Sequence, residues 1–276
     1  MRGLSQARNI LCSKDDVPQS PAMYSMEQEK AVITAAEKFM LETMARYDPS
    51  HDAYHVQRVR KTALQIAKNV SPPPDMLVVE LAALLHDVLD KKYVSAEDAA
   101  DPYKFFLPFF ESMTSQYGVD FVKDGRGRLI TQVIDNVSWS TEKELKMKGL
   151  YTKWHAECVE LHCVQDADRL DAIGAFGIMR CAAYTSVTNK QAATTCTSLW
   201  SNTYLPPSAL YAPIGDPKQP NSAIQHFHDK LLNIRDRLKT EHGKRLGTKR
   251  HQVLLDFIDA IEEEYIFSES VPPKAD

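Results

Sequence analysis

The chain has 276 residues, 43% of them hydrophobic, which is enough to form one large helical domain or two small ones. Its formal net charge is −4, and no basic face is concentrated enough to bind a nucleic-acid backbone, although small anionic ligands remain possible. The longest apolar runs are too short to span a membrane. The five cysteines form no CxxC pair and predict a reducing, cytoplasmic setting rather than a disulfide framework.

Residues 1–25 are predicted to be a flexible tail. Two arginines and no acidic residue precede Asp15, so a mitochondrial presequence is the alternative interpretation. From Met26 onward helical periodicity dominates, and no stretch alternates as a strand would. Residues 26–268 are therefore expected to form one all-α domain, followed by a flexible tail at 269–276. The expected helices span residues 26–47, 51–69, 75–90, 102–117 with an interruption near Pro108, 127–139, 153–165, 169–186, 224–241 and 246–267.

Histidines and aspartates stand at the apolar faces of three expected helices. The middle helix is the most informative, because His86 and Asp87 end the apolar run at 78–85, where both are costly to bury unless something binds them. Upstream, the helix at 51–69 opens with two histidines; downstream, the segment 165–175 carries three aspartates. The order His, His-Asp, Asp supplies two imidazoles and two carboxylates. It predicts one divalent ion, namely Mn, Mg, Fe, Co, Ni or Zn, with water in the remaining positions.

These segments resemble the HD-domain metal-dependent phosphohydrolase superfamily, and within it the bacterial hydrolases of the YpgQ/YedJ type. The strings that carry the resemblance are SHDAYHVQRV, LHDVLDKK, DADRLDAIGAFGI and HFHDKLL, and it extends from Glu27 to Tyr265. The resemblance implies that the chain is a single HD-domain helical bundle. It also implies that the residues of an H…HD…D signature bind the metal: His55, His86, Asp87 and Asp168.

The residues around this signature would supply the rest of a phosphohydrolase site. Asp90 follows Asp87 by three residues, and the resemblance implies that it is the general base; the alternative is a solvated helix terminus. Arg58 shares the helix face of His55, where its guanidinium could hold a phosphate and assist catalysis. Two further cations have expected roles, Lys91 in catalysis and substrate binding and Lys92 in substrate binding.

Other polar residues of these helices have expected roles outside the metal shell. The resemblance implies that His226 and Lys230, spaced one turn apart, return to the site and bind substrate, although the sequence alone indicates an ordinary amphipathic helix. Asp166 and Asp171 are expected to orient the metal ligands rather than to bind the ion. The arginines near them are expected to form ion pairs; these are Arg169 and Arg180.

A second metal site is suggested by the His-x2-Cys-x3-His spacing of His155, Cys158 and His162. That helix offers no obvious fourth ligand, so we interpret the three as partly buried helix residues. The tryptophans are likewise expected to be core or loop anchors rather than base-stacking platforms; they are Trp139, Trp154 and Trp200.

The segment 188–222 breaks the helical pattern and is rich in threonine, serine, proline and asparagine. It follows the helical region that contains Asp168, so it starts near the predicted metal site. A connection of this length is either a functional loop over the site or a passive surface insertion.

A divalent ion lowers the pKa of bound water and polarises a phosphoryl oxygen, so the predicted site suits hydrolysis of phosphate esters or anhydrides. The expected substrate is a small phosphorylated molecule, most simply a nucleotide. The resemblance favours nucleoside or deoxynucleoside triphosphates cleaved to monophosphate and pyrophosphate, and a nucleotide monophosphatase or phosphodiesterase is the nearest alternative. A non-catalytic regulatory module that binds metal and nucleotide is the alternative from another class. The presence of Asp90, Arg58 and the lysines argues against it.

Overall fold

The computed structural model of the chain describes residues 23–45, 53–89, 94–95, 97, 100–192 and 223–269. All regular elements within these ranges are helices, which confirms the predicted all-α class. In chain order they are α1 (Met26–Met44), α2 (Ala53–Ala67), α3 (Met76–Leu85), α5 (Pro102–Tyr117), α6 (Arg126–Asn136), α7 (Trp139–Met147), α8 (Lys153–Glu157), α9 (Val159–Asp171), α10 (Gly174–Ala192), α12 (Ala223–Asp229), the 3-10 helices η3 (Leu231–Asn233) and η4 (Arg235–Arg237), and α13 (Glu241–Glu269).

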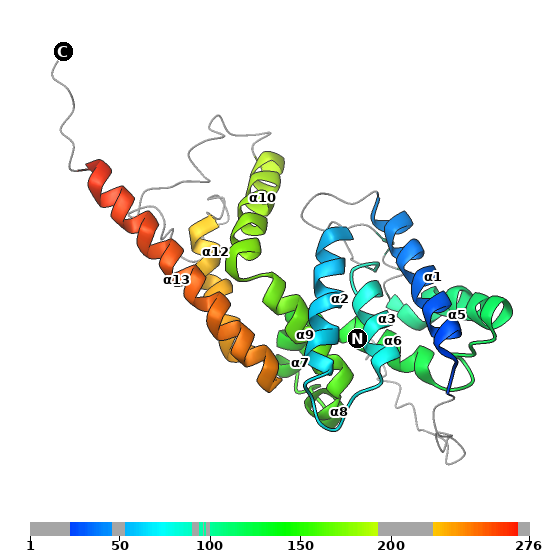
Figure 1. Cartoon of the computed structure of the whole chain (residues 1–276). Coiled ribbons are helices and arrows are strands. Elements are labelled where there is room, and N and C mark those ends of the chain that lie inside the picture. Colours follow the sequence, from blue (N-terminus) through cyan, green and yellow to red (C-terminus); the bar gives the residue numbers. More distant parts are fainter. Residues whose placement is uncertain are drawn as a thin grey trace, which may run out of the picture.

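Helix α3 lies at the centre of the bundle. From Leu77 to Leu85 every residue except Glu80 is buried, as expected for a helix that is apolar around its whole circumference. It packs against α1, α2, α6 and α9, and α2 also packs directly on α9. Figure 1 shows α1 and α5 at one end of the molecule and α10, α12 and α13 at the other. The helices α2, α3 and α9 therefore form the part of the core that the other helices cover.

The helix boundaries near Asp168 differ from the predicted ones. Cys158 has an extended backbone, with ψ of 106°, and separates α8 from α9, which continues to Asp171. Gly174 then begins α10 with φ of 78°, in the left-handed region that favours glycine. The predicted helices at 153–165 and 169–186 are therefore wrong in their limits, because these two local turns interrupt the chain where periodicity alone does not. The interruption predicted near Pro108 is also wrong, because α5 continues through that residue.

Helix α10 also changes the interpretation of the predicted loop at 188–222. The helix extends to Ala192, so residues 188–192 are helical, and α10 separates this segment from the helix that carries Asp168. Residues 193–222, which make up the rest of the predicted loop, lie outside the described residues. The same holds for the tail residues 1–22 and 270–276.

The predicted helix at 224–241 is wrong, because α12 ends at Asp229 and the short η3 and η4 follow before Asp166 holds the chain in front of α13. The buried Asp166 carboxylate accepts the backbone N–H of Lys239 at 2.9 Å and the N–H and hydroxyl of Thr240, each at 2.7 Å. These bonds fix Thr240 at the start of α13, where its hydroxyl accepts the N–H of Gly243. Asp166 thus joins α9 to α13, and the predicted role of Asp166 in orienting a metal ligand is wrong.

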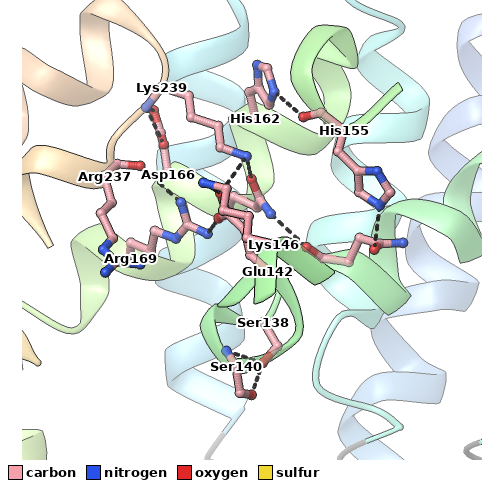
Figure 2. Close-up of polar contacts among 12 residues, drawn as sticks. Ser138, Ser140, Glu142, Lys146, His155, His162, Asp166, Arg169, Arg237 and Lys239 are labelled. Atoms are coloured by element: carbon pink, nitrogen blue, oxygen red, sulfur yellow. Dashed lines mark hydrogen bonds and ion pairs between the residues drawn. The ribbon is translucent and has the colours of Figure 1, made fainter. Parts of the chain in front are cut away.

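A buried ion network joins α7 to α9 and to the chain before α13 (Figure 2). Glu142 on α7 pairs with Arg169 on α9, and the side chains are only 7% and 3% exposed. The Nζ atoms of Lys146 and Lys239 lie 2.6 Å and 3.5 Å from Glu142 Oε1. Although burial raises the pKa of Glu142, these three cations bring it down to about 2. The cations therefore keep Glu142 ionised, and the buried Arg169 in turn needs the charge of the Glu142 carboxylate.

We expect Glu142→Gln to destabilise the fold by about 3–5 kcal/mol at pH 7, measured by urea unfolding, because Arg169 would stay buried without its counter-charge. The pKa of Glu142 is about 2 in the folded chain, against an ordinary value of 4.5. The stabilisation from the carboxylate is therefore complete above about pH 4.5 and is lost as the pH falls toward 2. The difference between wild type and variant should shrink over the same range.

The matched control for this prediction is Glu144→Gln on the same helix. Glu144 pairs with Lys148, and both side chains are 59% exposed, so the substitution should cost at most about 1 kcal/mol. Equal losses of stability in the two variants would contradict the role assigned to the buried network.

Candidate metal centre and its cavity

His55 reaches the centre of the site from α2 and is 2% exposed. Its Nδ1 lies 2.7 Å from Asp171 Oδ2, and because an ionised carboxylate only accepts, Nδ1 must be the donor. The other ring nitrogen, Nε2, lies 3.4 Å from Asp87 Oδ2 and 3.4 Å from Asp168 Oδ1. The hydrogen bond to Asp171 therefore fixes the ring with Nε2 directed at two carboxylates.

His86 and Asp87 follow the last residue of α3, where the helix ends. His86 Nδ1 donates to the carbonyl of Ala83 at 2.8 Å, which leaves Nε2 with an available lone pair. Within the described residues this buried Nε2 makes no hydrogen bond. It lies 3.4 Å from Asp87 Oδ1 and 3.9 Å from Asp168 Oδ1. A buried ring nitrogen in this position costs free energy unless a ligand occupies it.

The four predicted metal ligands are thus brought together. One ligand atom each from His55, His86 and Asp168 all lie within 4.8 Å of one another, a spacing that could hold a metal ion. Asp87 approaches both histidines with its two oxygens. A carboxylate holds Nδ1 of His55, and a backbone carbonyl holds Nδ1 of His86. With the nearby carboxylates, two imidazoles held in this way are a suitable donor set for a divalent ion, so the residues present fit the predicted group.

The carboxylates of this centre act on the pKa of His55. Burial lowers the pKa of His55, but the carboxylates of Asp168, Asp171 and Asp87 outweigh it and raise the pKa to about 9. Burial also raises the pKa of Asp168, yet the two histidines hold it well below its ordinary range. A metal ion bound by Nε2 of His55 would take the place of a proton.

Asp171 is the anchor of the His55 ring. Besides His55, its carboxylate accepts Nε and Nη2 of Arg58 at 2.8 Å and 3.0 Å, and Nη1 of Arg180 at 2.9 Å. Asp171 thus contacts the candidate ligand His55, as its predicted orienting role requires, and the predicted ion pair of Arg180 is confirmed. Arg58 also lies over the ring of Phe176, at 4.7 Å from its centroid. The structure therefore places Arg58 against Asp171, and its direct contact with substrate stays a prediction.

We expect Asp171→Asn to weaken metal binding by about 10- to 100-fold, measured by isothermal titration calorimetry, because an amide holds the His55 N–H less strongly than a carboxylate does. Asp166→Asn is the matched control, since Asp166 is a buried carboxylate on the same helix that contacts Lys239 and Thr240 instead. That variant should lose stability but keep its metal affinity. Parental affinity in Asp171→Asn would show that the His55 ring needs no carboxylate anchor.

A cavity of about 580 Å³ opens beside this centre. His55, His86, Asp87 and Asp168 line one part of it. The lining also includes two cationic residues, Arg180 and Lys230, and the residues at the start of α7. Lys230 therefore reaches the cavity, as the resemblance implies.

The other predicted substrate residues have different placements. His226 is not among the residues that line the cavity; its ring lies 6.4 Å from that of Tyr184, and burial lowers its pKa. Three residues that were predicted to act in catalysis or substrate binding lie outside the described residues; they are Asp90, Lys91 and Lys92. Their roles stay predictions.

Sequence reasoning missed the wall of the cavity at the start of α7. This helix was not among the predicted elements, and its first residues line the cavity together with Asp135 of α6. The signal that could have found the helix is Ser138, which caps its first turn, followed by Glu142 within that turn. The sequence contains no comparable signal that this turn faces the metal ligands, because that depends on packing.

Within the part of the chain that the structure describes, His155, Cys158 and His162 do not come together as a possible metal site. His155 Nδ1 lies 3.0 Å from the N–H of Thr152, and its Nε2 lies 3.1 Å from Asn136 Oδ1. His162 Nε2 bonds the carbonyl of His155 at 2.9 Å (Figure 2). Both histidines are therefore occupied by contacts within the bundle, which agrees with their interpretation as partly buried helix residues.

Comparison with known proteins decides the family. Residues 52–173 match the family model of the HD domain. Over 219 residues the chain is 30% identical to YpgQ of Bacillus subtilis (strain 168), an uncharacterized protein, and the alignment covers 78% of the chain and 84% of YpgQ. The chain belongs to the HD-domain family. The resemblance that the sequence motifs indicate is thereby confirmed.

Solved structures share the fold of this HD domain. An HD-superfamily hydrolase from Bacillus thuringiensis matches with a TM-score of 0.58 and 25% identity, over 86% of this chain and 98% of that one. YpgQ of Bacillus subtilis in complex with ADP matches with a TM-score of 0.56 and 24% identity, over 86% and 96% of the two chains. The chain thus has the fold of HD-superfamily hydrolases. Among its described helices, none is both long and apolar enough to cross a membrane.

Proposed function

We propose that this HD domain is a metal-dependent phosphohydrolase that cleaves nucleoside or deoxynucleoside triphosphates to monophosphate and pyrophosphate. The observation that carries the proposal is the buried Nε2 of His86, which lies beside Asp87 and Asp168 at the cavity wall and makes no hydrogen bond within the described residues. A divalent ion held by His86, Asp87, Asp168 and His55 would supply the missing partner.

When bound, the ion would polarise a phosphoryl oxygen and lower the pKa of a water ligand. Side chains of the protein would bind the phosphates and accept the proton. Arg180 and Lys230 line the cavity, where their positive charges would attract phosphate oxygens. Asp90 would accept the proton of the attacking water, and Arg58 would hold Asp171 and thereby His55. The remaining residues proposed to contact the phosphates are Lys91, Lys92 and His226.

Two observations support a nucleotide as the substrate. YpgQ, which shares the fold, has been solved in complex with ADP. The cavity beside the candidate ligands has a volume of about 580 Å³, within the range of pockets that take small organic molecules. A single inorganic phosphate would leave most of this space to water.

The test is a screen of ribonucleotides and deoxyribonucleotides at each phosphorylation level, in the presence of Mn²⁺, Mg²⁺, Co²⁺ or Zn²⁺, with His86→Ala as the background control. Release of pyrophosphate from triphosphates supports the proposal. Release of orthophosphate from monophosphates, or cleavage of diesters, would establish one of the alternative activities. Binding of metal and nucleotide without turnover would establish a regulatory module. Neither binding nor turnover with any of the metals would overturn the assignment to nucleotides.

A further inference from the structure

The wall of the cavity at the start of α7 differs in chemistry from the metal centre. Ser138, Trp139, Ser140 and Thr141 line it, and none of them belongs to the H…HD…D signature. Ser138 Oγ accepts the N–H of Ser140 at 3.2 Å, so the first turn of α7 is already capped by a side chain of its own (Figure 2). This N–H is then less available to an anion. The wall therefore offers an indole ring and neutral hydroxyl groups.

Trp139 is half-buried, and two guanidinium groups lie near its ring. The guanidinium carbon of Arg237 lies 3.9 Å from the ring centroid, and that of Arg169 lies 5.9 Å away. Arg169 Nη1 donates to the carbonyl of Arg237 at 3.0 Å, and Arg169 pairs with Glu142 on α7 (Figure 2). The buried network thus holds Arg169 near the indole, and the guanidinium of the exposed Arg237 lies over the ring. A ring that is already ordered loses little conformational entropy when a ligand stacks on it.

Charge separates this wall from the metal centre. Near the candidate ligands, Arg180 lines the cavity and bonds Asp171, which in turn holds His55. Near Trp139, Arg169 also lines the cavity, but its two terminal nitrogens are taken by Glu142 and by the carbonyl of Arg237. Both arginines are thus paired with a carboxylate, and the distinguishing charge is the cluster beside His55 that could hold a cation. Such a cation would favour phosphates there, whereas the wall of α7 offers an indole ring to an uncharged ring system.

We propose that Trp139 is a specificity-determining residue that stacks on the nucleobase of the bound nucleotide. The inference rests on the proposed function, since it assigns the organic part of a substrate whose phosphates lie near His55. An aromatic side chain stacks on any base, because every base has a π face. Trp139 would therefore favour nucleotides over inorganic phosphates without selecting one base. In this role it is a stacking platform as well as the anchor that the sequence predicts.

The experiment compares the binding of ADP and inorganic pyrophosphate by isothermal titration calorimetry in wild type, Trp139→Leu and Trp139→Phe, with Mg²⁺ present. The preference for ADP should fall by about 10- to 100-fold in Trp139→Leu, because base–aromatic stacking is lost, and should be largely kept in Trp139→Phe. Trp154→Phe is the matched control: Trp154 packs against His155 and is not among the residues that line the cavity. It should keep the parental preference.

Tryptophan fluorescence gives a second readout that does not need Trp139→Leu to fold. ADP should quench the emission of wild type and of Trp154→Phe, but should quench Trp139→Phe much less. An unchanged ADP preference in Trp139→Leu, or undiminished quenching in Trp139→Phe, would overturn the inference while the proposed function stands. If wild type binds neither ADP nor pyrophosphate, the proposed function fails and this inference fails with it.

Discussion

Replacing His86 with alanine should reduce the metal content of the folded protein from about one ion per chain to nearly none. The reason is geometric: His86 Nε2 and His55 Nε2 are the two ring nitrogens directed at Asp87 and Asp168, and both rings have their other nitrogen engaged. Loss of the ion should lower the rate of hydrolysis roughly 1,000-fold or more, since a metal contributes several kcal/mol to the transition state. Elemental analysis by plasma mass spectrometry measures the first effect directly.

Asp168→Ala should be measured in parallel, together with one histidine variant as a control. Asp168→Ala removes the carboxylate that lies within reach of both histidines and should behave like His86→Ala. His162→Ala removes a histidine whose Nε2 bonds the carbonyl of His155 away from the cluster, and it should keep its metal. Circular dichroism would show that each variant is folded. Full stoichiometric metal in both His86→Ala and Asp168→Ala would show that the proposed ligand set is wrong.

Asp90→Asn should lower kcat by about 100- to 10,000-fold while metal content and KM change little. Asp90 follows Asp87 by three residues in the sequence, and we expect its carboxylate to reach the attacking water without binding the ion. Asparagine keeps the shape of the side chain and removes its basicity. Steady-state kinetics and elemental analysis on the same preparation separate the two effects.

Asp256→Asn, on the exposed surface of α13, is the control and should hydrolyse at the parental rate. If Asp90→Asn does so as well, the general base lies elsewhere. Asp171 is then a poor candidate, because its carboxylate is bonded to His55, Arg58 and Arg180 and its pKa is held far below the ordinary range. Asp135, which lines the cavity, would be the next carboxylate to substitute.

The candidate metal ligands could be predicted partly from local pattern and partly from the resemblance, which singled out His55 and Asp168 among the histidines and aspartates of their segments. An apolar run as continuous as 78–85 must be buried on all sides, so the polar pair that ends it must be buried or must mark a site. The structure confirms this logic: α3 is buried, and His86 is 8% exposed at its end. The all-α class followed in the same way from periodicity.

The parts that were not predicted depend on contacts between distant segments. Asp166 stands two residues before Asp168, yet it caps the chain at Thr240 instead of serving the metal centre, because α13 packs on that side of α9. Trp139 looked like an ordinary anchor because its contacts with Arg237 and Arg169 join three separate elements. Neither arrangement produces a residue spacing that could be recognised in the sequence. The turn at Gly174, by contrast, was available as a signal, since glycine is the residue that tolerates positive φ.

The ligands of the candidate centre come from α2, from the end of α3 and from α9, and these helices also form the innermost part of the bundle. An ion bound there would link these three helices within the hydrophobic core and would also take part in catalysis. Because such an ion binds the native chain and not the unfolded one, its binding free energy adds to the free energy of unfolding. A chelator would then lower the stability of the fold as well as the activity. The melting temperature would therefore report metal occupancy even before any substrate is known.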